Sequence, residues 1–356
     1  FCLSRGLGDV YKRQGLLLTL VTWGAAADRW GERLVLGSGL GLAGLVLLAG
    51  STAAGTVALG ACLLVAGAAG ASVYAASGRL ILGWFAGHER GLAMGIRQGA
   101  QPLGVAVAAL TLPSLADHGR SVPLTFLGGF CVAAAVLVAF TVRDPPPPTA
   151  RAGERRGSPY REPMLWRIHA ASALLVVPQF TVATFALIYL VDARGWPAAQ
   201  AGRVLAVTAI CGAVARLGAG YWSDRAGSRM GPMRILAVAT GLIVAAVAAG
   251  AAARSSFVVA ALVVAAVAVV STNGLAFTAV AERAGPSWAG RALGIQNTGQ
   301  NAFAAATPPV VAAAIAPAGY PAVFAVVALL PFAAAALVPV TAERGAGRAR
   351  AGTMIS

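Results

Sequence analysis

"GYWSDRAGSR" occupies residues 220–229, between two long apolar runs, and "GAAADRWGER" occupies residues 24–33 in a similar setting. The two stretches share glycine at their first and eighth positions, an Asp-Arg pair in the middle and a final arginine. A second pair of similar segments, "RGLAMGIRQGAQ" at 90–101 and "GRALGIQNTGQ" at 290–300, aligns Gly95 with Gly294. The first pair lies 196 residues apart and the second 199, so the sequence predicts one duplicated unit.

The composition indicates a membrane protein. Of 356 residues, 58% are hydrophobic and 11% are charged, and the mean hydropathy is +0.76. A chain of this kind cannot hide its apolar side chains in one soluble core, so a lipid bilayer must cover most of them. The net charge of +15 comes from short arginine clusters between apolar runs, a pattern that argues against nucleic acid as a partner.

The sequence contains no pattern typical of an enzyme. Cys62, Cys131 and Cys211 lie inside apolar runs and Cys2 lies near the start of the chain, so no disulfide framework or metal-ligand spacing is indicated. A phosphate loop, a zinc-type His/Glu pattern and a nucleophile elbow are also missing from plausible contexts. We therefore expect no catalytic residue, no metal and no cofactor.

Ten apolar runs are long enough for membrane-spanning helices, which need about 20 residues. They cover approximately Leu34–Gly50, Thr56–Ser77, Gly91–Leu112, Val122–Val142, Met164–Val191, Ala198–Trp222, Met233–Ala253, Ser255–Val280, Arg291–Ala316 and Tyr320–Thr341. An eleventh run, Gly15–Ala27, would extend only about 20 Å as a helix and is too short to span. The expected fold class is an all-α membrane protein with about 11 helices.

The arginines predict the orientation, because short basic loops stay in the cytoplasm. Every second loop is arginine-rich, whereas the intervening loops hold only Arg120, Arg194 and Arg254. Residues 342–356 then form a cytoplasmic tail. The stretch "RDPPPPTARAGERRGSPYREP" at 143–163 is polar, basic and proline-rich, which is typical of an extended linker. It divides the chain into expected bundles at residues 15–142 and 164–341.

At residues 15–341 the chain resembles the major facilitator superfamily, whose G-x-x-x-D-R-x-G-x-R loop follows the second helix and recurs after the eighth. The motif residues are Gly24, Asp28, Arg29, Gly31 and Arg33, and in the second copy Gly220, Asp224, Arg225, Gly227 and Arg229. The resemblance implies two pseudo-symmetric six-helix bundles, a monomer, and movement of a small molecule by alternating access, often with a proton.

The resemblance also implies that the first helix is missing. About 55 residues separate the start of the seventh helix from Gly220, but only 23 precede Gly24. Residues 1–14, "FCLSRGLGDVYKRQ", carry four charges where the second half has a largely embedded segment. We interpret residues 1–14 as a non-native scar and exclude them from the fold; a native re-entrant N-terminus is the alternative.

By the same resemblance the two loops act as gates. Asp28 would contact the chain near Arg291–Leu293, and Asp224 would contact it near Gly91–Ala93, in each case at a helix start that attracts negative charge. These contacts would close the cytoplasmic side while the substrate cavity is open to the outside. The alternative is that the loops only set topology through their positive charge.

Arg216 is the sharpest candidate for binding substrate. It lies between Gly212 and Gly220 at helical spacing, on a stripe that packs or lines a cavity. A charge inside a span is costly, and an anionic substrate would offset that cost. The segment "ARLGAGYWSDR" is also similar to the eighth helix of monocarboxylate and oxalate/formate transporters. Snorkelling of the side chain to the interface is the alternative.

Two stripes of polar side chains complete the candidate substrate site. They consist of Arg97, Gln98 and Gln101 on one expected helix, and Gln296, Asn297, Gln300 and Asn301 on its counterpart in the other half. Tyr74 is a further candidate, and Gln179 and Asn273 are weaker ones. Hydrogen bonding between helices is the alternative role for all of these residues.

The acidic residues give no support to a proton relay. Each lies in a loop or at a helix end, so we expect no buried carboxylate, although the missing first helix could carry one. The segment "GAQPLGVAV" lacks the G-P-x-x-G-G pattern of drug antiporters. We therefore expect a proton- or gradient-coupled transporter of a small, anionic organic solute in the bacterial inner membrane. A drug or metabolite exporter of the same fold and a non-transporting membrane sensor are the alternatives.

Overall fold

The computed structural model describes residues 2–146 and 157–343, and the described chain is helical throughout, with no strand. Residues 147–156 of the expected linker and residues 344–356 of the expected tail therefore lie outside the described residues. The α-helices are α1 (Cys2–Trp30), α2 (Glu32–Ser51), α3 (Thr56–Trp84), α4 (Arg90–Ala116), α5 (Ser121–Thr141), α6 (Pro163–Ile188), α7 (Ala198–Ala226), α8 (Met230–Ala252), α9 (Phe257–Ala268), α10 (Asn273–Ala284) and α11 (Ala289–Leu337).

Nine segments within the described chain are long and apolar enough to cross a membrane, and α1 is not among them. The all-α membrane fold is thus confirmed. A 3₁₀ turn, Pro159–Arg161, precedes α6, and a π-helical turn, Tyr189–Ala193, follows it. Gly319, with φ of +76°, kinks α11 between two of the apolar runs expected to span the membrane.

The chain forms two compact units, and neither is continuous in sequence. Unit 1 contains residues 1–85, 100–158 and 281–301, and unit 2 contains 86–99, 159–280 and 302–356. The start of α11 thus belongs to unit 1, and the start of α4 belongs to unit 2. The division into bundles at 15–142 and 164–341 stays a prediction.

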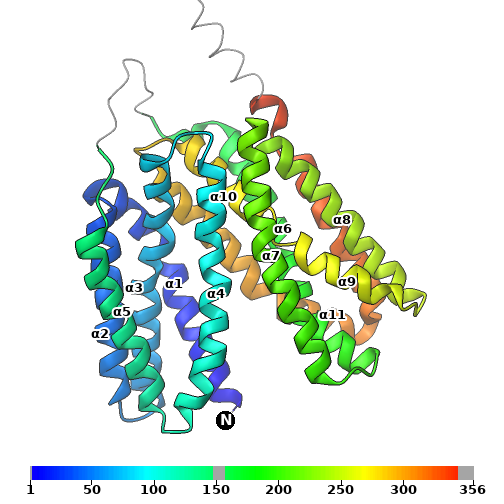
Figure 1. The fold of residues 1–356 in the computed structure, drawn as a ribbon, viewed down its shortest axis with the longest axis horizontal. Helices are drawn as coiled ribbons and strands as arrows, with labels where there is room; N and C mark the ends of the chain where they lie inside the picture. Colours follow the sequence, from blue (N-terminus) through cyan, green and yellow to red (C-terminus); the bar gives the residue numbers. More distant parts are fainter. Residues whose placement is uncertain (1, 147–156, 344–356) are drawn as a thin grey trace, which may run out of the picture. The chain divides into compact units, whose positions relative to one another are not determined.

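Within unit 1, α2 packs against both α3 and α5, and α3 also packs along α1 (Figure 1). Small residues permit close packing: a Cβ at Gly39 of α2 would lie 1.9 Å from Ser72 Oγ of α3. The core of unit 2 includes larger side chains, among them Phe185, Tyr189 and Phe324. Packing of glycine and alanine faces is what a helical membrane protein needs, because lipid gives no hydrophobic drive to helix association.

The first helix differs from the expectation for residues 1–14, which we had excluded from the fold. The structure continues α1 back to Cys2. A Cβ at Gly60 would meet the Tyr11 ring at 3.0 Å, and a Cβ at Gly67 would meet the Lys12 carbonyl oxygen at 2.1 Å, so this end of α1 lies against α3. Charged residues disfavour insertion of a segment into lipid, but they do not prevent a helix from forming. Lysine and arginine have high helix propensity, so α1 continues through this charged segment.

The expected span Ser255–Val280 is broken into α9 and α10. Residues 269–272 form a turn between them. Ser271 Oγ donates a hydrogen bond of 3.1 Å to the Val267 carbonyl oxygen, which illustrates how short polar side chains compete with the helix ladder. Hydropathy averaged over a whole span did not detect this break, because the polar stretch Ser271-Thr272-Asn273 is short and is flanked by apolar residues on both sides.

Candidate functional site

The first motif loop places Asp28 at the start of α11. Asp28 Oδ1 accepts a hydrogen bond from the Gly290 N–H at 2.8 Å, and Oδ2 accepts one from the Arg291 N–H at 3.0 Å. These groups belong to the first turn of α11 and have no partner within their own helix. The resemblance implies contact near Arg291–Leu293, and the observed contact includes Arg291 and begins one residue earlier, at Gly290.

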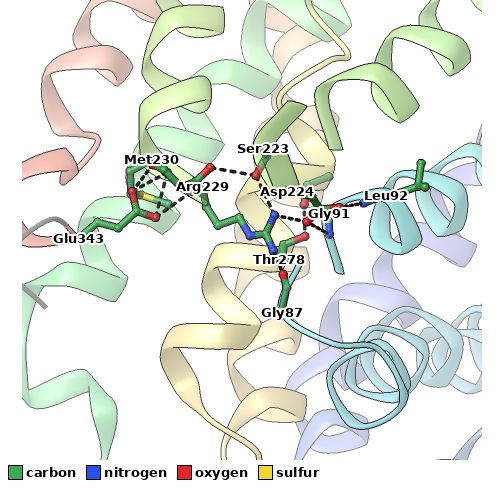
Figure 2. A network of polar contacts seen from close by, with 11 residues as sticks. Gly87, Gly91, Leu92, Ser223, Asp224, Arg229, Met230, Thr278 and Glu343 are labelled. Atoms are coloured by element: carbon green, nitrogen blue, oxygen red, sulfur yellow. Dashed lines mark hydrogen bonds and ion pairs between the residues drawn. The ribbon is translucent and has the colours of Figure 1, made fainter. Parts of the chain in front are cut away.

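The second motif loop repeats this arrangement at the start of α4 (Figure 2). Asp224 Oδ1 accepts from the Gly91 N–H at 2.9 Å, and Oδ2 accepts from the Leu92 N–H at 2.8 Å. In both copies the aspartate binds the second and third residues of the helix, where the positive end of the helix dipole stabilises a carboxylate. This contact lies within the range Gly91–Ala93 that the resemblance implied.

Pairs of glycines bring the backbones together at both places. A Cβ at Gly24 would lie 2.2 Å from the Gly290 carbonyl oxygen, and one at Gly220 would lie 2.3 Å from the Gly91 carbonyl oxygen. No side chain tolerates such distances. The glycines are therefore required sterically, because only a bare backbone lets each aspartate reach the opposite N–H groups.

The other two motif glycines shape the turns. Gly31, between α1 and α2, has φ of +87°, and Gly227, at the end of α7, has φ of +59°. Side-chain-bearing residues rarely adopt this conformation, so glycine is the natural choice at both positions.

Different arginines accompany the two aspartates. Arg229, the last residue of the second motif, is buried; its Nη1 donates to Asp224 Oδ1 at 2.5 Å and its Nη2 to the Gly87 carbonyl oxygen at 2.5 Å (Figure 2). The equivalent Arg33 is exposed and donates to the Ala139 carbonyl oxygen instead.

In the first copy the arginine that lies beside the motif aspartate is Arg79 of α3. Arg79 Nε lies 3.6 Å from Asp28 Oδ1, and Nη1 lies 2.8 Å from Glu32 Oε1 and donates to the Ala27 carbonyl oxygen at 2.7 Å. The repeated string gives no signal that Arg79 would join the first motif, because Arg79 lies on α3, about 50 residues away from the string.

A further carboxylate caps the helix after each motif. Asp144 Oδ1 accepts from the Glu32 N–H at 2.7 Å and the Arg33 N–H at 2.8 Å, at the start of α2. Glu343 Oε1 accepts from the Arg229 N–H at 2.8 Å, at the start of α8. Sequence analysis missed both roles, although Asp144 and Glu343 are separated by 199 residues, the same offset as Gly95 and Gly294.

The structure corrects the expectation that no carboxylate is buried. Asp28 and Glu32 lie at helix ends, as the sequence suggested, yet each side chain is only 1% exposed. Neighbouring helices cover these ends because the Gly24 contact draws the start of α11 over them. Asp28 and Glu32 therefore belong to a buried charged cluster that includes Arg79 of α3.

The remaining motif arginines lie at the surface. The guanidinium of Arg29 stacks on Trp30 at 5.9 Å, and that of Arg225 stacks on Tyr221 at 4.9 Å. Both side chains are exposed, so such cation–π contacts contribute about 0.5–1 kcal/mol.

Arg216 is buried in unit 2 and binds two backbone carbonyl groups. Its Nη1 donates to the Gln98 carbonyl oxygen at 2.9 Å, and its Nε donates to the Val270 carbonyl oxygen at 3.2 Å. Val270 lies in the break between α9 and α10, where helix carbonyl groups lose their usual partners. The side chain therefore turns into the protein, not toward the surface.

Gln98 joins Arg216 to the other arginine of the predicted stripe. Arg97 Nη1 donates to Gln98 Oε1 at 2.9 Å, and its guanidinium lies 5.6 Å from the Phe277 ring. Gln179 and Asn273, the weaker candidates, bond each other at 3.0 Å in the same unit. Arg97, Gln98 and Arg216 thus form one connected group.

The other predicted polar residues belong to unit 1. Asn297 and Asn301 donate to carbonyl groups four residues earlier in α11, at 2.8 and 2.9 Å. Gln296 is buried, Tyr74 and Gln300 are half-buried, and Gln101 is exposed. The role of these side chains in binding a substrate stays a prediction.

Two other features lie apart from these groups. A cavity of about 540 Å³ runs along α8 and is lined by Arg234, Ile235, Val238 and neighbouring residues, none of which is a predicted substrate ligand. Before α6, Tyr160 Oη lies 2.9 Å from His169 Nε2, and burial raises the pKa of the Tyr160 phenol.

Comparison with known proteins identifies the family. The model of the Major Facilitator Superfamily matches residues 15–308. An "uncharacterized MFS-type transporter" of Mycobacterium tuberculosis (strain H37Rv) is 43% identical over 329 residues, which cover 92% of this chain and 74% of that protein. The chain belongs to the Major Facilitator Superfamily.

Solved structures of the superfamily have the same fold. The Escherichia coli fucose:proton symporter aligns with a TM-score of 0.76 at 13% identity, over 94% of this chain and 90% of that one. The human organic anion transporter MFSD10 aligns with a TM-score of 0.73 at 17% identity, over 93% and 82%. The chain is therefore a multi-pass membrane protein with the fold of these transporters.

Proposed function

We propose that this chain is a secondary active transporter that moves a small, anionic organic solute by alternating access. It works as a monomer in the bacterial inner membrane, with the C-terminus in the cytoplasm and a proton gradient as the driving force. Catalysis and cofactors have no part in this activity. The observation that carries the proposal is the buried, uncompensated charge of Arg216.

Within the part of the chain that the structure describes, Arg216 has hydrogen-bond partners but no counter-ion. Among the described residues, its contacts are the carbonyl oxygens of Gln98 and Val270, and no carboxylate pairs with it. Carbonyl groups satisfy the N–H donors without neutralising the charge, and an unpaired charge away from water is costly. A substrate carboxylate would supply the missing negative charge.

The neighbours of Arg216 favour an anion over a neutral solute. Arg97 brings a second guanidinium to Gln98, so two positive groups meet at one residue. Guanidinium groups recognise carboxylates through paired, charge-assisted hydrogen bonds. The Gln98 amide would then select among anions by hydrogen bonding.

Solved structures of the same fold support, by analogy, both coupling to a proton gradient and an anionic substrate. The solved neighbours include proton symporters for fucose and xylose and an organic anion transporter. The Asp28 and Asp224 contacts would act as gates that form in one state and open in another. Each consists of charge-assisted hydrogen bonds of about 1.5–3 kcal/mol, which is comparable to typical differences between conformational states.

Uptake into proteoliposomes tests this proposal. The full chain should accumulate one or more of labelled lactate, formate, oxalate and cyanate when a proton gradient is applied, with competition among anions. Arg216→Ala should reduce uptake at least tenfold, because losing one partner of a buried charge pair costs about 2–5 kcal/mol. Arg203→Ala is the matched control, since Arg203 lies exposed on the same helix α7.

The outcomes separate the candidate functions. Anion uptake that survives Arg216→Ala removes Arg216 from the substrate site. Resistance to drugs without anion uptake supports the exporter, and the absence of any flux supports a sensor.

A further inference from the structure

The two copies of the motif differ at one buried position. Glu32 in the first copy corresponds to Ser228 in the second, at the same 196-residue offset as the motif glycines. Each of these residues lies beside the carboxylate that caps the following helix, Asp144 in the first copy and Glu343 in the second. The capping carboxylate therefore lies beside a carboxyl group, that of Glu32, in the first copy and beside a hydroxyl group, that of Ser228, in the second.

In the second copy the contact is a hydrogen bond from a hydroxyl group to the carboxylate. Ser228 Oγ donates to Glu343 Oε2 at 2.5 Å, while Glu343 also accepts from the N–H groups of Arg229 and Met230 (Figure 2). The capping carboxylate is thus surrounded by donors. The Ser228 hydroxyl also accepts from the Gly231 N–H at 3.0 Å.

In the first copy a carboxyl group replaces that hydroxyl donor. Asp144 Oδ1 lies 2.7 Å from the Glu32 backbone nitrogen, so the Asp144 carboxylate lies beside residue 32, as the Glu343 carboxylate lies beside Ser228, and it interacts with the Glu32 carboxyl group. Two neighbouring ionised carboxylates repel each other, whereas one proton held between them turns the contact into a hydrogen bond. Glu32 can therefore take the donor role of Ser228 only when its carboxyl group is protonated.

Glu32 and the charged groups around it include more carboxylates than guanidinium groups, which favours binding of a proton. The groups that face it are Asp28 on α1, Arg79 on α3 and Asp144 after α5, and Arg291 at the start of α11 pairs with Asp28 at 3.3 Å. Within the described part of the chain, two guanidinium groups thus pair with Asp28 and Glu32, and the third carboxylate, Asp144, is exposed and forms an ion pair with neither of them. Arg33, on α2 itself, is exposed and bonds a carbonyl group on α5.

Arg79 does not satisfy Glu32 by itself. Its Nη1 lies 2.8 Å from Glu32 Oε1, but its directed hydrogen bond goes to the Ala27 carbonyl oxygen at 2.7 Å. Glu32 Oε1 is buried without a hydrogen-bond partner among the described residues. An ion pair without a directed N–H bond compensates a buried carboxylate poorly.

We propose that Glu32 and Asp144 share one proton and form a proton-binding site at the start of α2. A proton from water adds to the Glu32 carboxylate, and the resulting O–H donates to Asp144, which keeps its N–H bonds to α2. When the proton returns to water, the two carboxylates repel and the cap at α2 weakens. Coupling of this event to solute movement rests on the proposed transport function.

Infrared spectroscopy of the purified full chain in lipid nanodiscs tests the site directly. The wild type should show the carbonyl stretch of a protonated carboxyl group at neutral pH, and raising the pH should abolish it. Glu32→Gln and Glu32→Ser should both lack this signal. Glu32→Ser restores the residue type of the second copy, so it should fold with Asp144 still hydrogen-bonded. Glu89→Gln is the control, because the Glu89 side chain is 55% exposed.

Thermal unfolding gives a second measurement. A proton bound only in the folded state makes the unfolding equilibrium constant rise by up to tenfold per pH unit as the pH increases through its release. This dependence should be present in the wild type and in Glu89→Gln and lost in Glu32→Ser. A wild type without the carboxyl signal, or a Glu32→Ser protein that keeps it, would overturn the proposal while leaving anion uptake as a separate question.

Discussion

At the scale of the residue, the last arginine of the repeated motif occupies two different environments. Arg229 is buried and bonds Ser223, Asp224 and Gly87, whereas Arg33 is exposed. Removing one partner of a buried ion pair typically costs about 3–5 kcal/mol, and an exposed pair is worth at most about 1 kcal/mol. We expect Arg229→Ala to lower the thermal unfolding midpoint in detergent much more than Arg33→Ala does. Equal losses would show that the burial of Arg229 contributes nothing to stability.

The motif aspartates should behave alike despite their different arginines. Asn in place of Asp28 or Asp224 keeps the shape of the side chain but removes the charge that strengthens its two N–H contacts. We expect each variant to lose about 1.5–3 kcal/mol of stability, the usual contribution of a hydrogen bond to a charged group. Asp117→Asn, at an exposed turn, should change the unfolding midpoint little. An unchanged midpoint in Asp28→Asn would mean that the contact with α11 is not a stabilising one.

The sequence could predict these aspartate contacts only in part. The repeated motif and the family resemblance predicted contacts with the helix starts near residues 91 and 291. Both the motif residues and the spacing between its two copies can be read directly from the sequence. For Glu32, by contrast, the sequence predicts a solvent-exposed position at a helix end. Its burial depends on Arg79 and Asp144, which approach from other helices, and no local pattern records such contacts.

At the scale of the element, the glycine contacts decide how closely helices approach. A Cβ at Gly220 would lie 2.3 Å from the Gly91 carbonyl oxygen, whereas a Cβ at Gly218, on the same helix α7, would meet nothing within 4 Å. Gly220→Ala should therefore force α7 away from the start of α4 and lower the unfolding midpoint. Gly218→Ala should be neutral or stabilising by about 0.5–1 kcal/mol, because alanine favours the helix. Equal effects in the two variants would contradict the close contact.

Helix boundaries show what hydropathy can and cannot predict. Most of the expected spans agree with observed helices to within a few residues, since the length of an apolar run and the turns that flank it are local features. The break between α9 and α10 was missed because its short polar stretch, Ser271-Thr272-Asn273, is flanked by long apolar segments that dominate the hydropathy of the span. There, Arg216 of α7 binds the Val270 carbonyl oxygen, so a contact from a distant part of the chain compensates the break.

At the scale of the whole molecule, the arginine distribution predicts which loops face the cytoplasm. Single cysteines in a chain whose four native cysteines, Cys2, Cys62, Cys131 and Cys211, are replaced by serine can check this in intact cells with a membrane-impermeant maleimide. We expect cysteines at His118 and Ser256 to react from outside, because their loops are poor in arginine, and cysteines at His88 and Ser287 to react only after permeabilisation. All four positions are exposed in the structure. A position that fails to react is therefore shielded from the reagent by the membrane and not by burial inside the protein. Labelling of position 88 or 287 from outside would reverse the orientation, and labelling of 118 but not 256 would mean that the two repeats do not cross the bilayer in the same sense.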